Sequence, residues 1–275
     1  MQLESMKQKV SNKNLIYYWR VWRQVVRSAL KRGYLYKTDI FVRFVRTILV
    51  LVIQIVLLNT LFGSNILYVG WSKSEAYLVI GIWNLLNYLG WSLFATNLLH
   101  LESNVIEGRF DYILLKPLLT SWYASFSDFF INNFVTALSG LALIGYYIFV
   151  EWHKISPINI LFSCIAICIA FVLWYGIYLF FASFTISNPR NGYLSIAKEL
   201  LGLTKYPINI FGEKLRIVLY TAIPIAFVTT VPANVMIGRG RTIYIFIALL
   251  ISISVLILGN RLWRWNIKKY TSASS

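Results

Sequence analysis

The chain has 275 residues, of which 58% are hydrophobic and only 13% are charged. A soluble globular domain carries roughly 25% charged residues, so this composition excludes an ordinary water-soluble enzyme. The net charge of +16 does not indicate binding to nucleic acid, because the chain offers no soluble domain on which a basic groove could form.

Long uncharged runs predict an all-α, polytopic membrane protein with about six transmembrane helices in a single domain, 1–275. Most of these runs reach the roughly 18 to 20 apolar residues that are needed to cross a bilayer core. In chain order, we expect an interfacial helix at 14–33, spans at 40–62, 75–99, 129–150 and 157–182, a fifth span within 188–240, and a last span at 242–260.

The first predicted element, 14–33, has the pattern of a helix that lies on the membrane surface. Leu15, Trp19 and Trp22 recur at helical spacing, while basic residues follow a different stripe. An apolar stripe with tryptophan beside a basic one is typical of interfacial helices. We expect this helix on the inner leaflet.

Basic residues also indicate the orientation of the chain. The stretch 1–46 is rich in lysine and arginine, and Arg261, Arg264, Lys268 and Lys269 follow the last predicted span. Short segments rich in Lys and Arg stay in the cytoplasm. Both termini are therefore expected to be cytoplasmic, which requires an even number of spans.

The second predicted span carries a polar stripe of Asn84, Asn87 and Trp91. Asparagine in hydrocarbon needs a hydrogen-bond partner, so this stripe should face other helices or a polar cavity. The pattern alone leaves open whether these residues pack helices together or line a substrate pathway.

The most charged internal segment lies between the second and third predicted spans, at His100–Asp128, and it contains the loop 101–117. Within it, Glu102 to Leu115 is spaced as a short amphipathic helix that Pro117 ends. Such a helix lies between the second and third spans on the cytoplasmic side. Its apolar face is available to pack against a partner.

The limits of the fifth span depend on how 188–240 is interpreted. Hydropathy favours a cytoplasmic segment at 188–216 and a span from Ile217 to about Val235. Pro224 and Pro232 within that span argue instead for a broken, re-entrant element, which membranes tolerate only where protein or a cavity surrounds it.

Sites for chemistry are absent from the sequence. The chain contains no GxxxxGK[ST] loop, so we expect no ATP hydrolysis on it. His100 and His153 fall on opposite sides of the membrane in this topology and cannot share a site. No catalytic or metal site is predicted. A stand-alone secondary drug or lipid transporter is the main alternative, and a membrane scaffold is a third hypothesis.

Three segments resemble the permease subunits of ABC-2-type exporters, in particular the viologen-exporter-like branch. They are Glu102–Pro117, then Tyr206–Phe211, then Ile223–Phe227 continuing to Val231–Ala233 and Gly238–Arg239. The resemblance implies a type V exporter-like transmembrane domain, in which 14–33 is the elbow helix. It also implies a fifth span near Asn188–Lys205, followed by re-entrant outer helices at Tyr206–Gly238.

The resemblance further implies that 101–117 contains the coupling helix. The expected contacts with the ATPase are Glu102, Glu107, Arg109, Phe110, Asp111 and Tyr112. The partners would be ABC ATPase subunits, a second permease chain in a homodimer or a heterodimer, and membrane lipid, without nucleic acid. ATP and Mg would be bound by the partner ATPase, so no cofactor is expected on this chain.

The same family membership would place the protein in the cell membrane of a bacterium. Aromatic residues in the predicted spans, among them Trp83 and Trp174, would suit an amphipathic or cationic organic compound. Multidrug efflux is therefore the expected form of export, although aromatic residues in spans also serve in packing.

Overall fold

The computed structural model describes residues 15–35, 37–63, 70–221 and 223–271. Residues 1–14, the first part of the basic N-terminal stretch, lie outside this part. The described residues form helices and no strand. The α-helices are α2 (Leu15–Leu35), α3 (Lys37–Gly63), α4 (Lys73–Gly90), α5 (Thr96–Ile106), α6 (Phe110–Leu114), α7 (Thr120–Phe126), α8 (Ile131–Val150), α9 (Pro157–Thr185), α10 (Tyr193–Gly202), α11 (Glu213–Thr221), α12 (Thr230–Ile237) and α13 (Ile243–Ile267).

Helices long and apolar enough to cross a membrane make up most of the fold. In the described part there are 5 of them, Phe41–Thr60, Lys73–Ile106, Ile131–Val150, Pro157–Thr185 and Ile243–Ile267. The predicted all-α, polytopic architecture is confirmed. The difference from the expected number of about six lies in 188–240.

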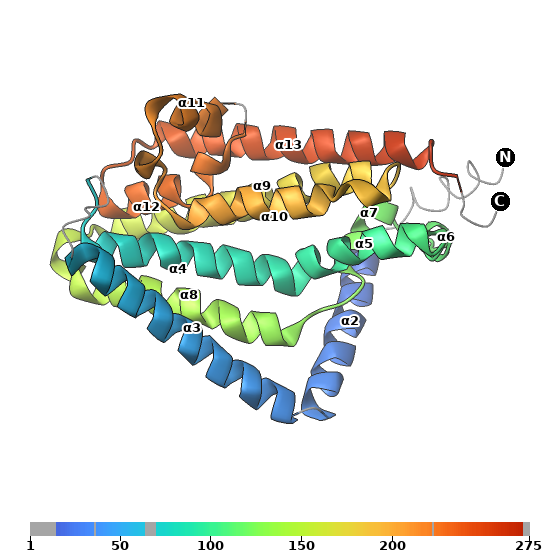
Figure 1. The fold of residues 1–275 in the computed structure, drawn as a ribbon, viewed down its shortest axis with the longest axis horizontal. Coiled ribbons are helices and arrows are strands. Elements are labelled where there is room, and N and C mark those ends of the chain that lie inside the picture. Colours follow the sequence, from blue (N-terminus) through green and yellow to red (C-terminus); the bar gives the residue numbers. More distant parts are fainter. Residues whose placement is uncertain (1–14, 36, 64–69, 222, 272–275) are drawn as a thin grey trace.

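Most of the long helices run along one direction with the short helix α10 beside them, and the other short helices lie toward the two ends (Figure 1). α4 packs on α8, α9 packs on α13, and α3 runs obliquely against α8. We call the end with α6, α7 and the C-terminus of α13 the α6 end, and the end with α11 and α12 the α11 end. α2 crosses the direction of the long helices and packs on α7 near the α6 end.

Among the described residues of 188–240 there is no helix of spanning length. α10 has 10 residues, and α11 and α12 are separate helices of 9 and 8 residues. The continuous span that hydropathy favours at Ile217–Val235 is therefore wrong. Pro224 lies in the break between α11 and α12, and Pro232 occupies the first turn of α12, where its missing N–H costs nothing.

Hydrogen bonds from side chains support the broken backbone of this region. Thr230 Oγ1 accepts from the Ile208 amide at 3.2 Å, and Thr229 donates to the Thr204 carbonyl at 2.6 Å. Ser163 on α9 donates to the carbonyl of Pro232 at 2.9 Å. Irregular backbone at membrane depth needs such internal partners, because lipid supplies none.

An ion pair joins the end of this region to the start of α4. Arg239 contacts both carboxylate oxygens of Glu75, at 2.8 and 3.1 Å, and donates to the Gly70 carbonyl at 2.9 Å. Glu75 also forms a capping box with Ser72 at the N-terminus of α4. The turn between α12 and α13 is therefore tied to α4 by a bidentate pair with fixed geometry.

Glycine allows the two main helix pairs to approach closely. A Cβ on Gly140 of α8 would lie 2.4 Å from the Leu85 amide nitrogen and 2.5 Å from the Gly81 carbonyl oxygen. In the other pair, a Cβ on Gly259 of α13 would lie 3.2 Å from the Phe180 amide nitrogen of α9. Helices in lipid associate through small residues of this kind, because van der Waals contact replaces the hydrophobic drive.

We predict that Gly140→Ala lowers the stability of the bundle. The added methyl group meets rigid backbone of α4, so the two helices must separate, and overpacking of this kind costs about 1–3 kcal/mol. Thermal unfolding in detergent, followed by helical circular dichroism, measures the effect. Gly145→Ala on the same helix is the control, because its Cβ meets nothing within 4 Å; equal melting of the two variants would contradict the prediction.

Candidate functional site

A single long helix connects the polar stripe to the charged segment. α4 passes into a π-helical turn at Trp91–Ala95 and then into α5, without a break between Lys73 and Ile106. Two side chains bond the carbonyl of Trp91, Thr96 at 2.7 Å and Asn133 of α8 at 3.4 Å. π-turns inside α-helices occur frequently at functional sites.

The residues of the predicted polar stripe have different environments. Asn84 is fully buried, and its amide exchanges two hydrogen bonds with Gln54 of α3, at 2.9 and 3.3 Å. Asn84 therefore joins α3 to α4. Asn87 and Trp91 are half-buried, and the Trp91 indole donates to Asn87 at 3.1 Å. The sequence analysis missed Gln54, although a glutamine inside an apolar run was a signal for such a pair.

α10 places charged side chains beside the same long helix. The Trp83 indole donates to the Leu201 carbonyl at 3.3 Å, and the Lys205 ammonium lies 5.6 Å from the centre of the Trp83 ring. Lys198 and Glu199 on α10 are 53% and 79% exposed. This face of the bundle therefore combines half-buried aromatic side chains with exposed charges.

The segment 101–117 is bent, unlike the single amphipathic helix that its spacing predicted. α5 ends at Ile106, Gly108 adopts a left-handed conformation with φ of 71°, and α6 begins at Phe110. Glycine takes positive φ without the steric cost of a Cβ, so Gly108 turns the chain where helical periodicity would have continued.

The bend separates the predicted contact residues into exposed and buried ones. Glu107 and Arg109 form an ion pair at 2.8 Å with about half of each side chain exposed, and Tyr112 is 69% exposed. Glu102 and Asp111 are half-buried. The exposed residues of this set share the outer side of the bend, which we call the bend surface.

Phe110 lies beneath the bend surface and is fully buried. Its ring packs edge-on against Tyr270 at 5.1 Å and against Trp263 at 6.5 Å between centroids. Burial raises the pKa of the Tyr270 phenol, and the neighbouring Asp111 carboxylate raises this pKa further. Phe110 therefore attaches α6 to the end of α13 and is not part of the exposed surface.

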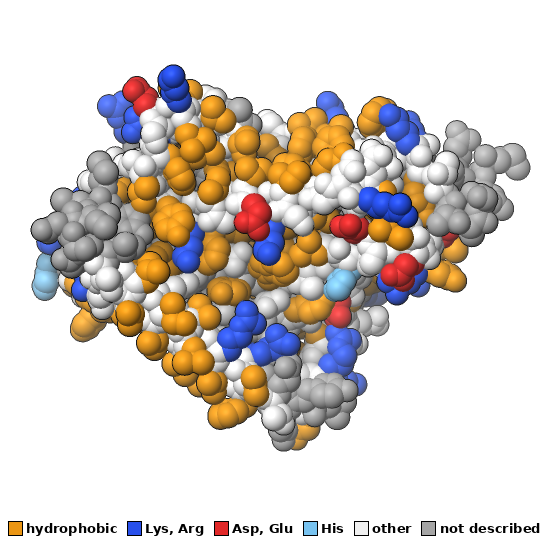
Figure 2. All heavy atoms as spheres, in the orientation of Figure 1, with side chains coloured by type: hydrophobic (Ala, Val, Ile, Leu, Met, Phe, Trp, Pro, Cys, Tyr) orange, Lys and Arg blue, Asp and Glu red, His pale blue; other side chains and the backbone are white. Residues whose placement is uncertain are grey.

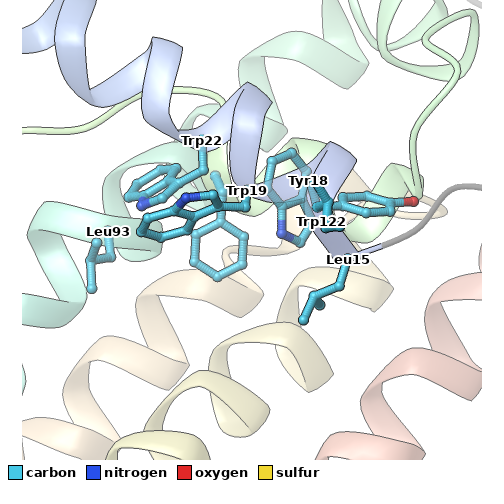
Figure 3. Close-up of a pocket in the computed structure, with 8 residues that line it drawn as sticks. Leu15, Tyr18, Trp19, Trp22, Leu93 and Trp122 are labelled. Atoms are coloured by element: carbon cyan, nitrogen blue, oxygen red, sulfur yellow. The ribbon is translucent and has the colours of Figure 1, made fainter.

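An aromatic cleft of about 600 Å³ separates α2 from the π-turn and α7. Trp19 and Trp22 reach it from α2, Leu93 from the π-turn and Trp122 from α7 (Figure 3). At its edges Tyr18 packs on Trp122 at 5.1 Å, and Trp22 packs on Phe126 at 5.8 Å. Tryptophan in such a position combines an apolar body with a polar N–H, as at membrane interfaces.

Comparison with known protein families gives a match to ABC-2 family transporter proteins over residues 48–274. The chain belongs to this family. It is therefore a membrane permease component. A comparison with curated proteins gives no match. The family match covers the bend, the π-turn and the region 188–240, and it leaves out α2 and the first part of α3.

We predict that Phe110→Ala loosens the bend from α13. Removal of a fully buried aromatic ring costs about 3–5 kcal/mol, and the loss should be local because α6 has few other buried side chains. Hydrogen exchange of residues 103–117 measures this opening. Tyr112→Ala is the control, with a change within about 0.5 kcal/mol because the ring is exposed; equal protection of the segment in both variants would exclude the anchoring role.

Proposed function

We propose that this chain is the permease subunit of an ATP-driven ABC exporter, with separate ATPase chains that bind ATP and Mg. A second permease chain, identical or different, completes the translocation pathway. The observation that carries the proposal is the exposed bend surface at the end of the long helix Lys73–Ile106. The given sequence has no ATP-binding loop of its own, so in this proposal a docked ATPase supplies the energy.

The α6 end is the cytoplasmic side in this proposal. Arg264, Lys268 and Lys269 lie at the end of α13, and α2, which carries further arginines, packs on α7 near the same end. These positions agree with the retention of basic segments in the cytoplasm. α2 then serves as the elbow helix on the inner leaflet, where its tryptophans line the aromatic cleft.

The bend surface can transmit motion in two directions. Through α5 it continues into the π-turn and α4, and through Phe110 it contacts the end of α13. When ATP draws the two ATPases together, the bends move with them, and the spans change the pathway from inward to outward access. Glu107, Arg109 and Tyr112 are the contact residues in this mechanism, while Phe110 positions them.

The pathway in this proposal follows the face where α10 lies beside α4. Trp83 lies about 15 Å from the start of α4, given the rise per residue of an α-helix. Its indole donates to the Leu201 carbonyl of α10. Lys198 and Glu199 are thus exposed at membrane depth. Charged groups at this depth face a water-filled cavity or a partner and avoid lipid. Asn87 and Trp91 extend the same helix toward the π-turn, whereas Asn84 packs against α3.

Half-buried indole rings and the Glu199 carboxylate on this face would suit a cationic or amphipathic organic compound. Multidrug efflux is the form of export that we infer from these groups. The segments Glu102–Pro117 and Tyr206–Phe211 favour the viologen-exporter-like branch of the family.

We predict that Glu107→Ala, Arg109→Ala and Tyr112→Ala together abolish recovery of the ATPase. The tagged chain is purified from its own cells in mild detergent, and bound proteins are identified by mass spectrometry. Loss of an exposed tyrosine and its charged neighbours from an interface should weaken binding at least about tenfold. Nucleotide hydrolysis by the purified complex should fall in parallel.

The control is Glu213→Ala with Lys214→Ala, a pair of exposed, oppositely charged residues on α11 at the other end of the bundle. This variant should retain the ATPase. Equal loss in both variants would remove the coupling role of the bend surface. A wild-type chain that purifies without any ATPase, and transports on a proton gradient alone, would establish the stand-alone secondary drug or lipid transporter instead.

We predict that the exposed face of α10 is accessible to water. In a Cys164→Ser, Cys168→Ser background, Ser195→Cys on α10 should react with a charged, water-soluble thiol reagent several times faster than Ser254→Cys on α13. Both serines are exposed on the bundle surface, and only a thiol in contact with water ionises to the reactive thiolate. The labelling rates are measured in membranes by mass spectrometry of the modified protein. Equal rates for the two cysteines would place α10 against lipid.

A further inference from the structure

The aromatic cleft between α2, the π-turn and α7 has the size and the lining of a small-molecule site. Its volume is about 600 Å³, and five of its eight lining side chains are aromatic. Pockets for drug-sized ligands occupy roughly 300 to 1,000 Å³ and are lined mainly by apolar and aromatic groups. The cleft can therefore hold a compound of this class.

The arrangement of the rings favours a planar aromatic ligand. Trp122 packs on Tyr18 with 75° between the ring planes, and Trp22 packs on Phe126 with 82°. In an edge-on pair only one of the two rings has its face covered by the other. The Trp19 ring joins them from α2 with 65% of the residue exposed (Figure 3). Open ring faces favour a flat aromatic system over a flexible acyl chain, because stacking adds to the free energy of burial.

The cleft also offers hydrogen-bond donors. The indole N–H groups of Trp19, Trp22 and Trp122 make no hydrogen bond with any residue in the described part of the chain. An indole nitrogen is a donor only. A ligand that carries acceptor oxygens at its polar end is therefore a better match for these three groups than a ligand that carries donors.

The charge around the cleft sets the sign of the ligand. No lining residue is acidic, and α2 contains five basic residues and no acidic one. Arg20 and Arg23, next to the lining tryptophans in sequence, are exposed and pair with no residue that the structure describes. Figure 2 shows Lys and Arg side chains over α2. A basic stripe is expected on a surface helix and is no site in itself, but it attracts an anion to the cleft and repels a cation.

We propose that the aromatic cleft binds a drug-sized, planar aromatic compound that carries an anionic group. Its rings stack on Trp19 and Trp122, and its anionic oxygens meet the indole N–H groups and the positive charge of α2. Leu93 belongs to the π-turn, so the bound compound joins α2 to the long helix Lys73–Ile106. The site is separate from the α10 face, where the exposed Glu199 suits a cation. Binding does not depend on the proposed coupling to an ATPase.

The test is fluorescent binding of 8-anilinonaphthalene-1-sulfonate to the purified full chain in phosphatidylcholine nanodiscs, with the signal of protein-free discs subtracted. We expect saturable binding that tetraphenylphosphonium, an aromatic cation, does not displace. Trp19→Ala with Trp122→Ala should weaken binding at least about tenfold, because the stacking faces are lost. Trp19→Ala alone removes an exposed ring, which should leave the fold intact, and should weaken binding about threefold.

The charge is tested with N-phenyl-1-naphthylamine, which has the same rings without the sulfonate. Arg20→Gln with Arg23→Gln should weaken binding of the sulfonate about threefold and leave binding of the neutral compound unchanged. Equal weakening of both compounds, or displacement of the sulfonate by tetraphenylphosphonium, would overturn the assignment of an anion.

The control is Trp152→Ala with Trp265→Ala, two exposed tryptophans outside the cleft, which should bind like the wild type. Equal weakening in this control would show adsorption to exposed aromatic surface and overturn the site. If lipid fills the cleft instead, discs that contain the protein will bind no more probe than empty discs, and the proposal fails.

Discussion

Close contact between helix backbones is the constraint on which the rest of this bundle depends. In lipid the side chains gain nothing by leaving an apolar solvent, so helices associate where small residues allow contact. Gly81 with Gly140, and Gly176 with Gly259, provide this contact for the pairs α4 with α8 and α9 with α13. The buried pair of Gln54 and Asn84 then adds α3 to the first of these units.

The broken region 188–240 packs against both of these units, with α10 and α12 on α9 and α12 also on α4. Its backbone is bonded by Thr229, Thr230 and Ser163, and its end is fixed to α4 through Arg239 and Glu75. The same arrangement leaves Lys198 and Glu199 exposed on α10. The region whose irregular backbone needs internal hydrogen bonds therefore also carries the face to which we assign the pathway.

One helix joins that face to the bend surface. The π-turn at Trp91–Ala95 adds a residue to one helical turn and rotates α5 relative to α4, while Asn133 and Thr96 bond the carbonyl at its start. The aromatic cleft under α2 adjoins this turn through Leu93. In the proposed mechanism, movement at the bend would therefore reach α4 through the π-turn, next to the helix α2 that we place on the inner leaflet.

The sequence by itself determined the helical class, most of the long apolar helices and the N-terminal amphipathic helix, because the length of an apolar run and its periodicity are local properties. Tertiary structure alone decided that Asn84 is buried while Asn87 is half-buried, that Phe110 packs on α13, and that Glu75 pairs with Arg239. Periodicity shows which residues share a face of a helix. It does not show what covers that face, because distant segments provide the cover.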